Sequence, residues 1–404
     1  MSRTLVDTGI QWIGKIPGDW DIVKVNKLFF RRKEVNTDID PTVLSLARSG
    51  VKVRDISTNE GQLAESYDNY HRVYFGDLML NPMDLVSGAN CSMSEVEGVI
   101  SPAYINLAKK EECNPKYYDY FFKNQYWVNA MFIHGKGVSF DNRWTMNAET
   151  IMDYKIPLPS IEEQNKIVDY LNDKCSKIDQ TIRDNNKEIE LLENLKEIKI
   201  YSILKNYPKV KIKYIISGIK DGTHGSFNRV DDGEYLLSSK NLTEKGIIIG
   251  DNESKISIDD YNSIVANGYP KKGDVMFCSV GNVGKTCIYD FEKSYAFQRS
   301  VSFLRTNNLM NNKILLYNTK TSFFKGEVES SINKAIQDGL YMNQIKDLKV
   351  FLPPISIQEK LANDIEKYVI KFDKIIEYRQ KIIEKLEEYK KSLIYEVVTG
   401  KKEV

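Results

Sequence analysis

An internal repeat limits the architecture of this chain more than any other feature. Residues 156–204 align without a gap on residues 350–398, at a constant offset of 194, with sixteen of the 49 positions identical. The identical pairs include Leu158 with Leu352, Pro159 with Pro353, Gln164 with Gln358, and Asp179 with Asp373. The chain therefore consists of two tandem halves, each a variable stretch followed by a similar segment. A polypeptide built this way can imitate a two-fold dimer while its halves stay chemically different.

Each repeated segment predicts one long helix. In the first copy a seam recurs at alternating spacings of four and three: Leu171, Cys175, Ile178, Ile182, Asn185, Ile189 and Leu192. The second copy keeps the same phase: Ile365, Val369, Phe372, Ile376, Arg379, Ile383 and Leu386. This spacing is typical of a coiled coil, so the expected partner of one seam is the other. The prolines before each seam mark the helix starts, and a helix from Ile161 to Leu204 would be roughly 65 Å long.

One seam position is polar in both copies, Asn185 and Arg379. Two interpretations stay open. The position is either a solvated break in a surface helix, or a layer that sets the register of the pair, because a polar seam residue gives up stability to exclude other alignments.

The two variable stretches predict compact, mainly β domains with a few short helices. Short runs rich in Val, Ile, Tyr and Phe alternate with Gly, Asn and Asp, and Gly76–Asn81 (GDLMLN) has a counterpart in Gly273–Cys278 (GDVMFC). With the helices, this gives an α+β fold with a pseudo-two-fold repeat. The predicted divisions are a first domain at 1–155, a helix at 156–205, a second domain at 206–349 and a second helix at 350–404.

Composition indicates an ordinary soluble protein. No apolar run approaches the roughly 18 residues of a membrane helix, and the first residues lack the apolar core of a signal peptide. The five cysteines include no Cys-x-x-Cys pair, which favours free thiols and a cytoplasmic location. The net charge of +1 does not by itself indicate DNA binding, so any positive surface must be gathered on one face.

The sequence carries no convincing catalytic or metal motif. Ser279–Thr286 (SVGNVGKT) lacks the first glycine of a phosphate-binding loop and precedes a strand-like run, so it fits a glycine-rich hairpin better. Asn81–Asp84 (NPMD) lacks the second proline and the aromatic residue of an adenine methyltransferase tetrad. The histidines have no ligands at metal spacing. We therefore predict neither catalytic nor metal-binding residues.

Basic residues occur where loops could reach a DNA groove, although each singly fits a solvated surface charge better. In the first half these are Arg31, Arg32, Lys33, Lys52, Arg54, His71, Arg72, Lys136 and Arg143. In the second half they are Lys220, His224, Lys240, Lys271, Lys272, Lys285, Arg299 and Lys334.

Several segments, in their order, resemble the DNA-specificity subunits of type I restriction–modification systems. The segments 8–25, 156–171 and 351–365 resemble the family's opening and the two conserved-region starts. Three further segments resemble parts of a second recognition domain: 219–227 (IKDGTHGSF), 273–285 (GDVMFCSVGNVGK) and 297–304 (FQRSVSFL). One departure is Ile357, which stands where the first copy has Glu163.

The resemblance implies two target-recognition domains that each read one half of a split, asymmetric DNA sequence, and two helices that pair antiparallel as a spacer. It also implies docking of two methyltransferase subunits, which bring S-adenosylmethionine, and of a motor–nuclease subunit, which brings ATP and Mg²⁺; this chain itself would bind no cofactor. The expected DNA contacts are Lys52, Arg54, Arg72, Lys136, Arg143, Lys220, His224, Lys240, Lys271, Lys285, Arg299 and Lys334. The expected interface positions are Gln164, Leu171, Ile178, Ile182, Asn185, Ile189, Leu192, Gln358, Ile365, Phe372, Ile376, Arg379, Ile383 and Leu386.

Two other functions compete with this one. One is a non-catalytic coiled-coil scaffold with two β lobes, which the absence of long polar linkers and further heptads disfavours. The other is an enzyme with an unrecognised site in a variable domain, which the missing motifs disfavour.

Overall fold

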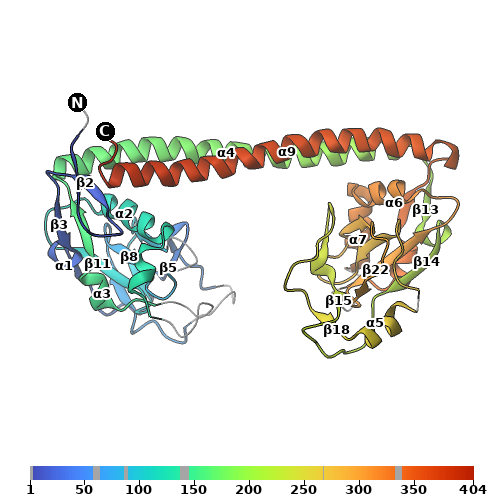
Figure 1. Ribbon diagram of the computed structural model, residues 1–404, viewed down its shortest axis with the longest axis horizontal. Coiled ribbons are helices and arrows are strands. Elements are labelled where there is room, and N and C mark those ends of the chain that lie inside the picture. Colours follow the sequence, from blue (N-terminus) through green and yellow to red (C-terminus); the bar gives the residue numbers. More distant parts are fainter. Residues whose placement is uncertain (1–2, 58–63, 86–89, 137–144, 267, 333–338) are drawn as a thin grey trace. The chain divides into compact units, whose positions relative to one another are not determined.

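The computed structural model describes residues 3–57, 64–85, 90–136, 145–266, 268–332 and 339–404 (Figure 1). The chain divides into two compact units, called unit 1 and unit 2 below. Unit 1 comprises Met1–Asn185 and Lys381–Val404, and unit 2 comprises Asn186–Gln380. Each unit therefore contains one β domain together with one end of each long helix.

The two long helices are α4 (Ile161–Leu204) and α9 (Ile355–Val398), which confirms the helix predicted from Ile161 to Leu204. Prolines precede both helices and disfavour helical backbone in the residues before them. At the start of α4, the hydroxyl of Ser160 accepts a hydrogen bond from the Glu163 amide at 3.2 Å, which satisfies one of the free donors of the first turn.

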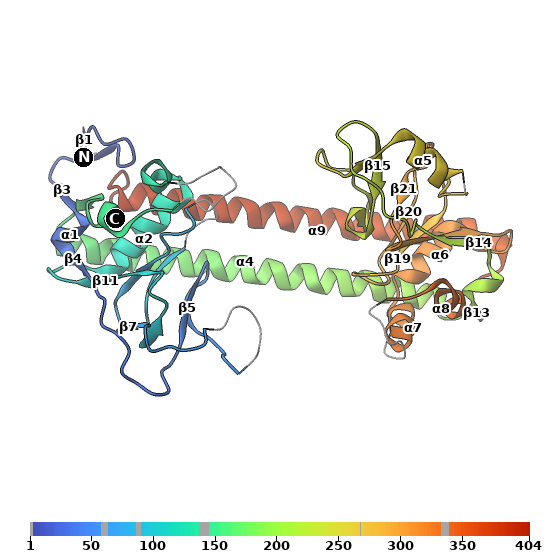
Figure 2. The same ribbon diagram turned by 90° about the horizontal axis from the view of Figure 1, so that it is seen from below.

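Within each unit the segments of α4 and α9 run antiparallel (Figure 2). In unit 2, Glu188 pairs with Arg379 at 2.7 Å, and Lys196 pairs with Asp373 at 2.9 Å. Residue numbers thus rise along α4 as they fall along α9. In unit 1, Lys390 binds Asp179 at 2.6 Å. Lys390 and Asp179 are the repeat counterparts of Lys196 and Asp373, so the same ion pair occurs once in each unit.

The seam positions are buried or half-buried in their own unit. The buried ones are Leu171, Cys175, Ile178, Asn185, Ile365 and Ile376. The half-buried ones are Ile182, Ile189, Leu192, Val369, Phe372, Arg379, Ile383 and Leu386. The amide of Asn185 donates to the Thr181 carbonyl of its own helix at 2.8 Å. Its proposed role in setting the register stays a prediction.

The described residues of the β domain of unit 1 form small sheets and three α-helices. Its strands are β1 (Leu5–Asp7), β2 (Lys15–Pro17), β3 (Asp21–Lys24), β4 (Phe29–Arg31), β5 (Leu44–Ala47), β6 (Gly50–Val53), β7 (His71–Val73), β8 (Leu78–Leu80), β9 (Cys91–Met93), β10 (Gly98–Ile100), β11 (Ile105–Lys109) and β12 (Lys155–Leu158). Its helices are α1 (Val25–Leu28), α2 (Pro115–Trp127) and α3 (Ala148–Met152). The central sheet has the order β4-β11-β8-β9.

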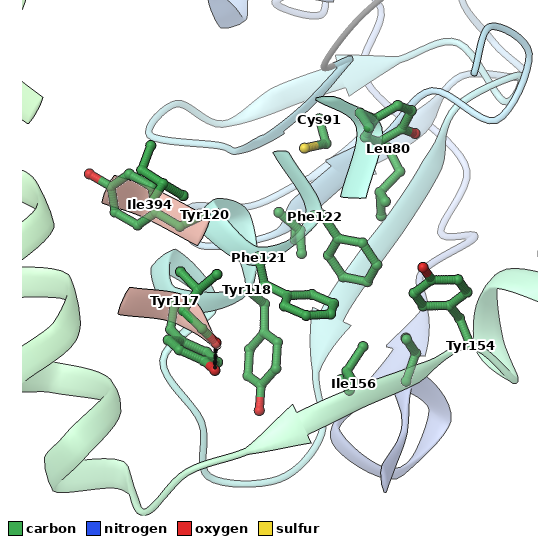
Figure 3. Packing of buried hydrophobic residues seen from close by; sticks show 14 of the residues in the cluster. Leu80, Cys91, Tyr117, Tyr118, Tyr120, Phe121, Phe122, Tyr154, Ile156 and Ile394 are labelled. Atoms are coloured by element: carbon green, nitrogen blue, oxygen red, sulfur yellow. Dashed lines mark hydrogen bonds between the residues drawn. The ribbon is translucent and has the colours of Figure 1, made fainter. Parts of the chain in front are cut away.

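Helix α2 fills the core of unit 1 with aromatic side chains (Figure 3). Tyr117, Tyr118, Phe121 and Phe122 are fully buried and pack with Ile156 of β12 and with the end of α9. The hydroxyl of Tyr117 donates to the carbonyl of Val398 at 2.8 Å. Aromatic rings bury large apolar areas, so this cluster fastens the end of α9 to the domain.

The β domain of unit 2 carries a second core of its own. Its strands are β13 (Lys209–Lys211), β14 (Ile216–Asp221), β15 (Glu234–Leu237), β16 (Leu242–Thr243), β17 (Gly246–Ile247), β18 (Lys255–Ile256), β19 (Val275–Cys278), β20 (Thr286–Ile288), β21 (Ala296–Phe297), β22 (Val301–Thr306) and β23 (Lys349–Phe351). Its helices are α5 (Ile258–Val265), α6 (Asn312–Thr319), α7 (Ser322–Ile332) and α8 (Met342–Asp347). A 3₁₀ turn at Ile212–Tyr214 separates β13 from β14.

Both units contain the same four-stranded sheet. The order β14-β22-β19-β20 in unit 2 corresponds to β4-β11-β8-β9 in unit 1, with every neighbouring pair antiparallel. The Gly-Asp pair before the third strand also recurs, although its arginine partner differs: Arg32 directly follows β4, the first strand, whereas Arg305 lies on β22, the second strand. Asp77 is buried and bound to Arg32 at 3.0 Å, and Asp274 is buried and bound to Arg305 at 2.7 Å. The repeat thus extends from the helices into the sheets, and the predicted α+β fold with two long helices is confirmed.

Candidate nucleic-acid interface

In unit 2, three loops meet at one end of the central sheet. The first loop, 221–229, follows β14; the second, 279–285, follows β19; and the third, 297–300, precedes β22. A buried chain of hydroxyl groups joins their bases. Ser279 lies 2.5 Å from Ser302, oxygen to oxygen, and the Ser302 hydroxyl donates to a carboxylate oxygen of Asp221 at 2.5 Å. Because a buried polar group is costly to leave unpaired, this chain holds the three loops together.

Backbone hydrogen bonds tighten the same end of the sheet. The amide of Arg299 donates to the Thr223 carbonyl at 3.0 Å, and the amide of Ser279 donates to the Ser300 carbonyl at 2.9 Å. Gly222 is required here because a Cβ at this position would lie 2.2 Å from the carbonyl oxygen of Gln298. The three loops therefore form one fixed surface, called the loop cluster below.

The three segments that resemble a recognition domain each supply one part of this loop cluster. The first brings Asp221, the second brings Ser279 and the third brings Ser302. None of these three residues was among the predicted site residues. Their positions in the three segments that resemble a recognition domain could have indicated them. Their contact with one another could not be predicted, because the segments lie far apart in the sequence.

Three of the predicted DNA contacts lie in the loop cluster, and a fourth lies beside it. His224 and Arg299 are exposed on two of the loops, and Lys285 ends the third. Lys240 lies beside them, because the amide of its neighbour Ser239 donates to the Ser300 hydroxyl at 3.1 Å. Its ammonium group is 2.8 Å from Glu253, so part of its charge is neutralised within the unit.

The remaining predictions for unit 2 lie elsewhere. Lys220 is on β14, with its ammonium group 5.2 Å from the centre of the Tyr269 ring. Lys271 precedes β19 and lies at the other end of that strand from Ser279. Lys334 lies outside the described residues.

The Ser279–Thr286 segment is a hairpin connection, not a phosphate-binding loop. β19 and β20 pair antiparallel, with Phe277 opposite Thr286. Gly284 has a φ of +88°, which glycine adopts without strain. A strand follows the Lys-Thr pair, so no helix N-terminus is available for a phosphate group.

In unit 1, the predicted contacts are spread over several strands. Burial of the His71 side chain lowers its pKa, and the nearby positive charges of Arg31 and Lys33 lower it further. Arg72 follows His71 on β7 and binds the carboxylate of Asp38 at 2.8 Å, an ion pair that raises its pKa. DNA phosphate would have to compete with Asp38 for this guanidinium group.

Three other predicted contacts of unit 1 lie on separate segments. Lys52 lies on β6, and the amide of Arg54 donates to the Val43 carbonyl at 2.8 Å. Two backbone hydrogen bonds join Lys136 and Thr145: the amide of Lys136 donates to the Thr145 carbonyl at 2.7 Å, and the amide of Thr145 donates to the Lys136 carbonyl at 3.0 Å. Arg143, between them in sequence, lies outside the described residues.

The two repeated glutamines are internal to their units. Gln164 is buried; its side-chain carbonyl accepts from the Asn114 amide at 2.8 Å, and its NH₂ group donates to Pro159 at 2.9 Å. The side-chain carbonyl of Gln358 likewise accepts from the Asn311 amide at 2.6 Å, and its NH₂ group donates to the Pro353 carbonyl at 2.8 Å. Asn114 caps α2 and Asn311 caps α6, so each glutamine joins the start of a long helix to a helix of the β domain.

Two negative results concern the described part of the chain. It contains no group of three or more His, Cys, Asp and Glu side chains arranged to hold a metal ion. Among the same residues, no helix is both long and apolar enough to cross a membrane.

Sequence comparison identifies relatives of known type. A family model described as the type I restriction modification DNA specificity domain matches residues 97–194. The specificity subunit of the type I restriction enzyme MjaVIII of Methanocaldococcus jannaschii is 22% identical, over 96% of this chain and 94% of that protein. The putative specificity subunit of MjaX from the same organism is also 22% identical, over 96% and 95%.

Structure comparison extends the likeness to the fold. A chain from a structural study of complex assembly and conformational transition in the type I restriction–modification system superposes with a TM-score of 0.66 at 12% identity. The superposition covers 95% of this chain and 98% of the other chain. The shared fold spans nearly the whole length of both chains.

Proposed function

Because the chain belongs to the family of type I restriction–modification specificity subunits, we propose that it reads a bipartite, asymmetric DNA target and docks two adenine methyltransferase subunits. The observation that carries this proposal is the repeated sheet with unlike loops. Each unit has the same strand order, while the loops at the ends of the strands differ in sequence. Two alike scaffolds with unlike loops suit two different half-sites, whereas a true homodimer would suit a palindrome.

In unit 2, the loop cluster is the proposed reading surface. His224, Lys285 and Arg299 would enter a groove or contact phosphate, since Arg and Lys donors match both guanine edges and phosphate oxygens. The buried Ser302 and Ser279, with the half-buried Asp221, would fix the loops, so little ordering is needed on binding. The modest net charge is compatible with this role, because partner subunits would supply further phosphate contacts.

In this proposal the chain itself performs no chemistry. The methyltransferase subunits would bind S-adenosylmethionine, and a motor–nuclease subunit attached through them would bind ATP and Mg²⁺. The chain would act in the cytoplasm, where the chromosome is accessible.

Mapping of methylated adenines tests the proposed function. Cells expressing the chain with its methyltransferase subunit should modify one interrupted, asymmetric motif, and cells expressing the methyltransferase alone should not. Modification of the same motif without the chain would contradict a specificity role. If the chain bound the methyltransferase but no motif were modified, the scaffold alternative would be favoured.

A second comparison tests the loop cluster. Arg299→Ala should weaken binding of the assembled complex to its target by about 10-fold or more, the effect of one good base contact. Lys271→Ala, at the other end of β19, should weaken it less. The opposite order would move the reading surface away from the loop cluster.

A further inference from the structure

The loop cluster of unit 2 contains four large apolar residues, and one of them is exposed. Phe227 and Val283 are half-buried, and each packs against a hydrophobic core of the unit. Phe297 is fully buried, whereas Val280 has an exposed fraction of 46%. A single exposed valine is common on protein surfaces, so the position of Val280 and the residues around it decide what it can bind.

The backbone on both sides of Val280 is held in place. The thiol of Cys278 donates to the Val280 carbonyl at 3.1 Å, and the amide of Leu340 donates to the Ser279 carbonyl at 2.9 Å. Gly339 lies directly against the valine, since a Cβ at Gly339 would be 3.0 Å from Cγ2 of Val280. A β-branched side chain has few χ1 rotamers. The methyl groups of Val280 are therefore presented with little conformational freedom to lose on binding.

Unit 1 carries an apolar residue at the corresponding position. The amide of Met146 donates to the Pro82 carbonyl at 2.9 Å, and Met146 is separated from Leu340 by the repeat offset of 194. The same hydrogen bond therefore occurs in both units, and Met83, which follows Pro82, corresponds to Val280. Met83 is half-buried. Both units place an apolar side chain after the third strand of the sheet, and the two side chains differ in shape.

The other side chains that the loop cluster exposes are polar. They include His224, Asn282 and Arg299. Side chains of these types form hydrogen bonds with phosphate oxygens and with the donors and acceptors of base edges. Val280 cannot form such a hydrogen bond, so a contact between Val280 and DNA would have to be apolar.

The major groove offers an apolar side chain one kind of partner on the base edges. Guanine, adenine and cytosine present hydrogen-bond donors and acceptors there, and thymine adds the methyl group on its C5 atom. 5-Methylcytosine carries the same group at the same atom. Phosphate and sugar contacts carry no direct sequence information, so an apolar contact that distinguishes bases is expected at a C5-methyl group.

We infer that Val280 contacts the C5-methyl group of one pyrimidine, a thymine or a 5-methylcytosine, in the half-site of unit 2. This inference rests on the proposed function and goes further, because it assigns one side chain to one chemical group of the target. The contact would remove two apolar surfaces from water. Burial of one methyl group corresponds to about a three- to fivefold change in affinity.

Base analogues in the DNA test the inference with the assembled complex of the chain and its methyltransferase subunits. Methylation mapping first gives the motif. Each thymine of the motif is then replaced in turn by uracil, which lacks only the methyl group, and each cytosine by 5-methylcytosine. Equilibrium binding gives the Kd of every duplex for the parent chain, for Val280→Ala and for Val280→Ile. Met83→Ala is the matched control in unit 1.

With the parent chain, uracil at one position should weaken binding about three- to fivefold. Val280→Ala should bind the thymine and uracil duplexes equally at that position. Val280→Ile, which keeps a branched apolar side chain, should retain the difference, and so should Met83→Ala. This result would identify thymine as the source of the methyl group.

Two other outcomes decide between the remaining possibilities. If 5-methylcytosine at one position strengthens binding by the parent but not by Val280→Ala, methylated cytosine is the source. If Val280→Ala keeps the parent's response to every methyl group, or if the parent responds to none, the inference is wrong.

Thermal unfolding separates a contact with DNA from a structural role. Because much of the Val280 side chain is exposed, Val280→Ala should lower the melting temperature by a few degrees at most. Equal weakening on all duplexes together with a larger loss of stability would assign Val280 a structural role and overturn the inference. If the parent complex does not distinguish its motif from unrelated DNA, the proposed function fails, and the inference fails with it.

Discussion

Gln164 and Gln358 act at the residue scale as latches between helix and domain. Each is almost fully buried and uses both ends of its side-chain amide, the oxygen toward Asn114 or Asn311 and the nitrogen toward the proline before its helix. Gln358 also donates to the Leu309 carbonyl at 2.9 Å. Removing such an amide leaves buried backbone groups without partners.

Gln358→Ala should destabilise unit 2 by about 2–3 kcal/mol, the cost of leaving buried polar groups unpaired. Chemical denaturation of the chain measures the change. The control is Lys360→Ala, two positions further on an exposed part of the same turn, which should change stability by less than about 0.5 kcal/mol. Equal effects would show that the Gln358 amide does not act as a latch.

The carboxylate of Asp221 has a different role, because it positions the loop cluster through Ser302 and Ser279. Ser302→Ala breaks this chain of hydroxyl groups at its centre. We expect relaxed sequence preference in one half of the target, with the other half unchanged and the melting temperature lowered by a few degrees at most. Methylation mapping measures the preference, and Ser302→Thr, which keeps the hydroxyl, should restore it. A variant that loses stability without any change of preference would assign Ser302 a purely structural role.

At the scale of elements, the two copies of one ion pair fix the pairing of the long helices inside each unit. Asp179 with Lys390 and Lys196 with Asp373 are partly exposed, so each stabilises its helix segment modestly. Their value is in specificity, since a shift by one heptad would separate both pairs. The repeat supplies the same device to each unit.

A charge-swap cycle measures this coupling. Asp179→Lys and Lys390→Asp should each destabilise unit 1, and the double swap should recover about 0.5–1 kcal/mol relative to the sum of the single changes. The same cycle at Lys196 and Asp373 is the internal replicate in unit 2. A coupling energy of zero in both cycles would show that the ion pairs do not set the register.

The helices could be predicted closely from sequence, but the site could not. Seam periodicity, together with the prolines that precede the seam, predicts α4 from Ile161 because helical contacts are local. The order β14-β22-β19-β20 depends on pairings between distant segments, which periodicity does not report. The family resemblance placed Gln164 at an interface, whereas in the structure Gln164 is buried in unit 1 and accepts a hydrogen bond from the backbone amide of Asn114. The sequence also shows Ile357 where the first copy has Glu163, but not what Glu163 does. In the structure, Glu163 binds Arg3 and accepts a hydrogen bond from the Trp20 ring nitrogen at 2.8 Å.

At the scale of the whole molecule, we propose that the helices set the gap between two half-sites. One matched heptad inserted after Leu192 and one after Leu386 keep the seam in phase and lengthen each helix by roughly 10 Å. This corresponds to about three base pairs and turns the duplex by roughly 100°. The variant should bind weakly or accept a longer gap. Methylation mapping distinguishes these, and an unchanged gap at full activity would leave the helices no role in spacing.

The central claim is that two alike units read two unlike half-sites independently. Replacing residues 21–155 by the recognition domain of another specificity subunit tests it most directly, with methylated adenines mapped in cells that express the methyltransferase. One half of the motif should change while the other half stays as in the parent. A change in both halves, or in neither, would contradict it.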